Sequence, residues 1–170
     1  PVVTTTAILA DFVKNVGGDK IEVRSIVRPG ADIHSFHPTP QDSIAISNAM
    51  LIVSNGGGLD DFLEPALKSA GTDGALRLVA SDGLSLDQGS GDPHLWQNPE
   101  YTVHYIARIR EGLVLVDTPN AAVYRHNADS FIRAVRTMDQ EIEATLQSVP
   151  AERRHMVTFH DAFGHFGARY

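Results

Sequence analysis

Three of the eight histidines in this 170-residue sequence stand beside predicted turns, where ligand-binding side chains are common. His34 lies in a loop after a predicted strand, His94 lies between a polar loop and the start of a helix, and His160 ends a predicted strand. Neutral imidazole binds Zn²⁺ without help from a thiolate, and the sequence contains no cysteine. Because the three histidines form no short ligand pair, their spacing alone leaves a metal site open beside ordinary loop-capping and helix-capping roles.

The overall charge of the sequence narrows the class of partner. The formal net charge is −7, and no cluster of Lys and Arg offsets it. Binding to duplex nucleic acid relies on neutralised phosphates, so nucleic acid is not expected and a cation is favoured. No apolar run approaches the ~20 residues that span a bilayer, and the N-terminus has no basic-then-apolar signal. We therefore expect either a cytoplasmic chain or one whose targeting segment has been removed.

Alternating strand and helix patterns must position these histidines. β-rich runs over residues 2–5, 21–27, 50–54 and 76–80 alternate with helical patterns over residues 8–16, 43–49 and 59–70. Strands that alternate with helices indicate an α/β fold with a parallel sheet, in which ligands bind at the carboxyl ends of the strands. Asn98 followed by Pro99 predicts a capped helix start just after His94. Residues 81–93 are rich in Ser, Asp and Gly, and this composition predicts a flexible surface loop.

A long helical pattern divides the sequence. Apolar residues recur at intervals of three and four from residue 120 to about 148, which predicts one helix about 45 Å long. That length exceeds a small domain of about 30 Å, so we expect the helix to bridge two lobes. We therefore divide the chain into an N-terminal α/β metal-binding lobe (1–119), a long connecting helix (120–149), and the first strand (His155–Phe159) and helix (Asp161–Ala168) of a truncated C-terminal lobe (150–170). The apolar positions of the long helix are Tyr124, Ala128, Phe131, Val135, Met138, Ile142, Leu146 and Val149.

Three ordered motifs resemble those of a known family. Residues 32–40 read DIHSFHPTP, which is similar to the Asp-Pro-His-x-Tyr-Glu-Pro-Thr/Ser-Pro signature of the zinc- and manganese-binding solute-binding proteins of bacterial ABC importers. Residues 92–96 read DPHLW and match that family's Asp-Pro-His-x-Trp. Residues 158–166 read TFHDAFGHF and resemble its Ser/Thr-x-His-Asp-Ala-Phe-Gly-Tyr-Phe. The motifs, the opening strand and the long helix follow the family's order, so the resemblance covers essentially the whole chain.

The resemblance implies two α/β lobes joined by one rigid helix, with a metal ion bound between them. His34 and His94 would be ligands from the first lobe and His160 the first ligand from the second, while the family's acidic fourth ligand would lie beyond Tyr170. The implied function is high-affinity capture of Zn²⁺ or Mn²⁺ at the periplasmic or extracellular face of the cytoplasmic membrane, with delivery to the permease of an ABC importer. This is binding rather than catalysis.

Departures from the family pattern bear on the choice of metal. Ile33 stands in place of the usual Pro, His37 in place of Glu, and His165 where Tyr is common. The loop at residues 81–93 contains no histidine, unlike the His-rich loop of many zinc-specific members, and this weakens the case for zinc as the bound metal. His160 stands where strongly manganese-selective members often carry Glu, which favours zinc. We expect Zn²⁺ ahead of Mn²⁺, with His37 and His165 as neighbours rather than ligands.

Two other functions fit the same residues. Three histidines with an open fourth position also activate water at zinc, so a zinc-dependent hydrolase with Asp161 as general base is one alternative. An adhesin-like module with a structural metal is the other. Whatever the function, an unpaired edge strand in the truncated second lobe would favour self-association of the chain.

Overall fold

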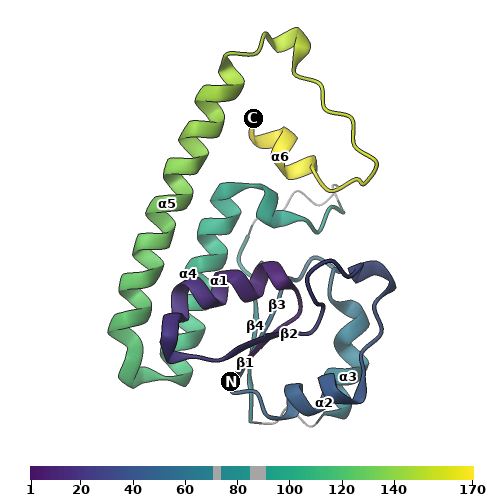
Figure 1. Cartoon of the computed structure of the whole chain (residues 1–170), viewed down its shortest axis with the longest axis vertical. Helices are drawn as coiled ribbons and strands as arrows, with labels where there is room; N and C mark the ends of the chain where they lie inside the picture. Colours follow the sequence, from purple (N-terminus) through teal and green to yellow (C-terminus); the bar gives the residue numbers. More distant parts are fainter. Residues whose placement is uncertain (71–73, 85–90) are drawn as a thin grey trace.

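The strands of the protein form one parallel sheet in a computed structural model that describes residues 1–70, 74–84 and 91–170. They are β1 (Val2–Thr4), β2 (Val23–Ser25), β3 (Leu51–Ser54) and β4 (Leu76–Val79), in the order β2-β1-β3-β4 (Figure 1). The predicted α/β class is confirmed. Residues 85–90 of the predicted surface loop lie outside the described residues.

Helices cover both faces of this sheet (Figure 1). α1 (Ala7–Gly17) and α4 (Pro99–Val116) pack on one face, with α5 (Ala121–Gln147) packed against these two helices. α2 (Pro40–Ser47) and α3 (Glu64–Ser69) pack on the other face. Successive side chains of a strand point to opposite faces. Leu51 therefore joins the core under α1 and α4, whereas Ile52 joins the core under α2 and α3. The pattern fits the central strand β3, in which Leu51, Ile52 and Val53 are all buried, whereas the edge strands β2 and β4 each carry an arginine.

The carboxyl edge of the sheet is where the chain changes direction. β2 lies on one side of β1 and β3 on the other, so the connections after β1 and β3 diverge and leave a crevice at their ends. Thr6 lies at this edge and caps α1, because its side chain accepts a hydrogen bond from the Leu9 backbone N–H. The same edge receives the start of α4, which Asn98 caps as predicted by accepting from the Glu100 N–H.

The long helix α5 spans 27 residues, which corresponds to about 40 Å (Figure 1). Its N-terminal half packs on α1 and α4, and Asn127 Nδ2 donates to the Val16 carbonyl at 3.0 Å. The buried face differs from the prediction in the second half of the helix. Met138 is 45% exposed, while Asp139 lies one residue further on and is buried.

Asp139 connects α5 to α6 (Gly164–Arg169). Its two carboxylate oxygens accept hydrogen bonds from Arg169 Nη2 and the Tyr170 hydroxyl, each at 2.7 Å. Burial by itself would raise the pKa of Asp139, but these two donors and the arginine charge hold the pKa below its ordinary value. The terminal helix is therefore fixed to α5 by an ionised carboxylate.

The predicted strand at His155–Phe159 is wrong for this structure. These residues form no strand, and Val157 and Phe159 are fully exposed. A strand needs a hydrogen-bonded neighbour, and the four described strands all belong to the N-terminal sheet. The following helix begins later than predicted, at Gly164 with Phe163 as its N-cap, rather than at Asp161. Within the described ranges, no helix is long and apolar enough to cross a membrane.

Candidate metal centre

A cavity of about 260 Å³ lies at the carboxyl edge of the sheet. Loops after the strands supply much of its wall, including Thr6 after β1 and Leu59 after β3. His94, Trp96 and His160 complete the wall from the α4 side and from the C-terminal segment. The cavity therefore occupies the crevice that the strand order predicts.

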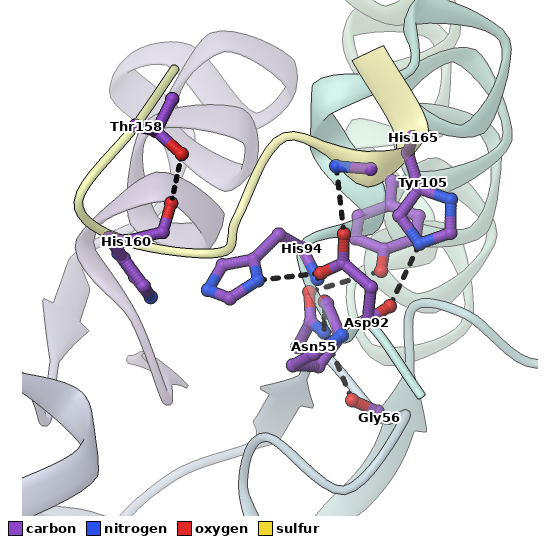
Figure 2. Close-up of polar contacts among 10 residues, drawn as sticks. Asn55, Gly56, Asp92, His94, Tyr105, Thr158, His160 and His165 are labelled. Carbon is purple, nitrogen blue, oxygen red and sulfur yellow. Dashed lines mark hydrogen bonds and ion pairs between the residues drawn. The ribbon is translucent and has the colours of Figure 1, made fainter. Parts of the chain in front are cut away.

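His94 and His160 meet at this cavity although they are far apart in the sequence. Their ring centroids are 4.9 Å apart, and the rings are nearly perpendicular, at 85° (Figure 2). His94 is buried in the loop before α4, whereas His160 is exposed on the segment that leads to α6. The Thr158 hydroxyl donates to the His160 carbonyl at 2.9 Å and shapes this turn. The structure thus brings together two of the three predicted ligands.

Asp92 determines how the His94 ring is oriented. Its Oδ1 atom lies 2.7 Å from His94 Nδ1 and also accepts from the His94 backbone N–H at 2.9 Å (Figure 2). Burial alone would raise the pKa of Asp92, but the two hydrogen bonds from His94 and the nearby charges of His94 and His165 lower it below its ordinary value. An ionised carboxylate only accepts, so Nδ1 carries the proton. In the neutral ring Nε2 then carries the lone pair that a metal ion requires.

The same carboxylate also contacts the start of α6. The Gly164 backbone N–H donates to Asp92 Oδ2 at 3.2 Å, and His165 Nε2 donates to the Asp92 carbonyl at 2.8 Å (Figure 2). A Cβ atom at Gly164 would lie only 2.8 Å from Asp92 Oδ2, so a glycine permits this close approach. His165 also packs edge-on against Tyr101, with ring centroids 5.6 Å apart. Asp92 therefore joins the loop of one predicted ligand to the segment that follows another.

His34 is described only through its backbone. It lies in a short 3₁₀ turn, Ile33–Ser35, in the loop after β2, and its side chain is outside what the structure describes. Ile33, the residue before it, lines the cavity, so the main chain of His34 is adjacent to the site. His37 is exposed. Among the described side chains, no three of the His, Cys, Asp and Glu type surround one point, and the third ligand stays a prediction.

Sequence reasoning missed the supports of His94. Asp92 lies in the quoted motif, two residues before His94, but its contact with Gly164 depends on how the C-terminal segment docks. Asn55, directly after β3, is a second support, and its side chain is fully buried beside the His94 loop. An asparagine directly after a buried apolar strand, at the edge where ligands bind, is the signal that could have identified it.

Solved structures and curated proteins resemble the chain along its whole length. The metal-dependent lipoprotein YcdH from Bacillus subtilis superposes with a TM-score of 0.91 at 29% identity, covering 99% of this chain and 63% of that one. The iron-binding protein YfeA of Yersinia pestis is 34% identical over 99% of this chain and 56% of its own length. The manganese ABC transporter substrate-binding lipoprotein PsaA of Streptococcus pneumoniae is 34% identical over 99% of this chain and 58% of its own length.

The fold and the site therefore define an α/β lobe of the class seen in metal-binding lipoproteins. Residues 2–170 match the family described as zinc-uptake complex component A, periplasmic (ZnuA), and the chain belongs to that family. The chain spans a little more than half the length of the curated relatives it matches, 56% of YfeA and 58% of PsaA.

Proposed function

We propose that this chain captures a divalent metal ion outside the cytoplasmic membrane and delivers it to the membrane permease of an ABC-type importer. The observation that carries the proposal is the edge-to-face contact of the His94 and His160 rings, with centroids 4.9 Å apart, in the crevice beyond the sheet. Asp92 fixes the ring of His94 in the tautomer that ligation requires. Membership of the ZnuA family and the printed names of YfeA and PsaA point the same way.

The ligands that we propose are His34, His94 and His160. His94 and His160 are supported by their contact and by the cavity that both line. His34 is supported by the position of its backbone next to the cavity-lining Ile33. We retain the division into a metal-binding lobe at 1–119, a connecting helix at 120–149 and the start of a second lobe at 150–170.

The metal that we propose is Zn²⁺ ahead of Mn²⁺. Apart from His94 and His160, the described wall of the cavity contains Thr6, Arg28 and apolar residues, and no carboxylate is among its described residues. Neutral nitrogen donors suit zinc, whereas manganese prefers carboxylate and other oxygen ligands. Relatives carry names that specify iron and manganese, so direct comparison of the metals is needed.

The hydrolase alternative is not favoured by the position of its required base. Asp161 is exposed and lines a separate hollow beside α5, together with Phe166 and Tyr170, rather than the cavity of His94. Self-association of the chain stays a prediction, but residues 155–159 do not form the edge strand from which it was expected. The molecular mass measured by analytical ultracentrifugation at high concentration would test it.

Metal titration of single-histidine variants tests the proposal. Zn²⁺ and Mn²⁺ affinities are measured by competition with a chromophoric chelator for the wild-type chain and for His34→Ala, His94→Ala and His160→Ala. We expect each substitution to weaken zinc binding by at least tenfold. His126→Ala is the matched control, because His126 is an exposed histidine on α5. Wild-type affinity retained in His94→Ala and His160→Ala would overturn the proposal, as would equal losses in His126→Ala.

A further inference from the structure

A buried polar network lies directly beneath the His94 loop. Asn55, at the end of β3, has no exposed surface, and its Nδ2 atom donates to the Pro93 carbonyl at 2.9 Å and to the Gly56 carbonyl at 3.0 Å (Figure 2). Its Oδ1 atom accepts from the hydroxyl of Tyr105 on α4 at 3.0 Å, and Tyr105 also has no exposed surface. The network therefore joins β3, α4 and the His94 loop.

The Tyr105 hydroxyl and two backbone carbonyls together determine which way the Asn55 amide points. A phenol that donates to Oδ1 holds that oxygen on the α4 side, which leaves the two N–H groups of the amide for the Gly56 and Pro93 carbonyls. Burial and the nearby Asp60 carboxylate raise the pKa of Tyr105, so the phenol keeps its proton at physiological pH. Without this donor, Oδ1 would lose its hydrogen bond in a buried site, and the amide would be held only through its NH₂ group by the Gly56 and Pro93 carbonyls.

The bond from Asn55 reaches His94 through a single peptide group. The Pro93 carbonyl and the His94 N–H belong to the same peptide, which is planar. Asn55 holds the oxygen end of that plane, and Asp92 Oδ1 holds the nitrogen end at 2.9 Å. Because both ends of this peptide plane are held, the position of the His94 Cα atom is fixed. Asp92 then fixes the direction of its ring.

We propose that Asn55 and Tyr105 are positioning residues for the metal ligand His94, holding its backbone so that its ring nitrogen meets the cavity at the correct place. This inference rests on the proposed function, since His94 is a ligand only if the site binds metal. Neither residue lines the cavity among its described wall, so both act through the Pro93–His94 peptide. A purely structural role would stabilise the fold without changing how His94 is presented.

Tyr105→Phe is the informative variant because it removes one hydroxyl and leaves the packing in place. Tyr124→Phe is the matched control: Tyr124 is another tyrosine without exposed surface, and its hydroxyl donates to Asp117 at the base of α5. Both variants are expected to lower the denaturation midpoint of the metal-free chain. Only Tyr105→Phe should weaken Zn²⁺ affinity, by about tenfold, the lower end of the range for residues that support a ligand.

A second readout does not depend on bound metal. The imidazole ¹H–¹⁵N signals of His94 in the metal-free chain should shift or broaden in Tyr105→Phe and stay unchanged in Tyr124→Phe. Asn55→Asp provides a stronger perturbation, because a carboxylate oxygen would face the Pro93 carbonyl. If that variant does not fold, Tyr105→Phe is sufficient to test the positioning role.

The outcomes separate this inference from the proposed function. If the wild-type chain binds zinc and Tyr105→Phe binds it equally well with unchanged His94 signals, only the positioning role is overturned. Equal losses of affinity in Tyr105→Phe and Tyr124→Phe would also overturn it, since they would show a general effect of stability. If the wild-type chain binds no metal, the proposed function fails, and the His94 signals alone decide whether the network positions that ring.

Discussion

Asp92→Asn should weaken zinc binding while changing the shape of the side chain very little. In the native protein, Oδ1 accepts from the His94 N–H and from Nδ1, and Oδ2 accepts from the Gly164 N–H. An asparagine has one acceptor oxygen and one NH₂ group. In either orientation, the NH₂ group therefore faces a backbone donor that the carboxylate had satisfied.

Each orientation of the asparagine has a definite consequence. If NH₂ faces His94, Nδ1 must become the acceptor, so the proton moves to Nε2 and blocks the nitrogen that we propose as the ligand. If NH₂ faces Gly164, the ring keeps its tautomer but loses the negative charge that increases its basicity, and the α6 contact is broken. Loss of such a partner costs about 10–100-fold in affinity, which corresponds to about 1.4–2.8 kcal/mol.

The assay is chelator competition with Zn²⁺ at fixed pH and ionic strength. Asp82→Asn is the control, because Asp82 is an exposed aspartate whose removal changes the net charge by the same amount. Its carboxylate lies 4.0 Å from the Arg108 guanidinium, a contact expected to contribute little. Affinity in Asp92→Asn within twofold of the wild type would refute the role of the carboxylate. An equal loss in Asp82→Asn would assign the effect to net charge instead.

Three further predictions concern packing and the C-terminal contacts. Ile106→Ala removes a side chain with no exposed surface and should lower the free energy of unfolding by about 2–5 kcal/mol in urea denaturation. Leu115→Ala is the control, because Leu115 is 71% exposed, and it should change that free energy by less than about 0.5 kcal/mol. Because the pKa of Asp139 is lowered by folding, its contribution to stability is present above the unfolded-state pKa of about 3.9 and is lost as pH falls through the lower folded-state pKa. The protection factors of the α6 amides against hydrogen exchange should therefore fall below about pH 4, and Asp139→Asn should remove that dependence on pH. Gly164→Ala places a Cβ atom 2.8 Å from Asp92 Oδ2 and should displace the C-terminal segment. Comparison of the ¹H–¹⁵N spectra of the variant and the wild type should show shifted α6 amide signals. Unchanged signals would contradict this prediction.

Local sequence signals were sufficient for most of the N-terminal lobe. Apolar strands and capped helix starts are short-range features, and Asn98 before Pro99 marks the first turn of α4 as predicted. The start of α2 was placed three residues late. The structure begins it at Pro40, because Asp42 accepts from the Thr39 N–H and hydroxyl and stabilises an earlier first turn.

The C-terminal elements could not be predicted in the same way because they depend on tertiary partners. The β-rich run at 155–159 has the composition of a strand, but strand formation requires a neighbouring strand to pair with. Asp139 interrupts the expected apolar stripe of α5, and only the docking of Arg169 and Tyr170 explains its burial. Periodicity identifies the face of a helix, but it does not reveal an ion pair with a distant segment.

The candidate site was predicted in outline and not in detail. Placing His94 and His160 after or beside strand ends, together with the resemblance, indicated that they would meet, and their rings do so. The supports of His94 come from Asn55 and Tyr105, which are 38 and 12 residues from Pro93 in the sequence and carry no motif of their own. Such contacts become visible only when β3 and α4 are packed together.

α5 extends well beyond the lobe on which it rests. Its N-terminal half packs on α1 and α4, where Asn127 donates to the Val16 carbonyl. Further along the helix, Asp139 accepts hydrogen bonds from Arg169 and Tyr170. The segment after His160 is therefore held at two points, by Asp92 at its start and by Asp139 at its end, so that the far half of α5 acts as its second anchor.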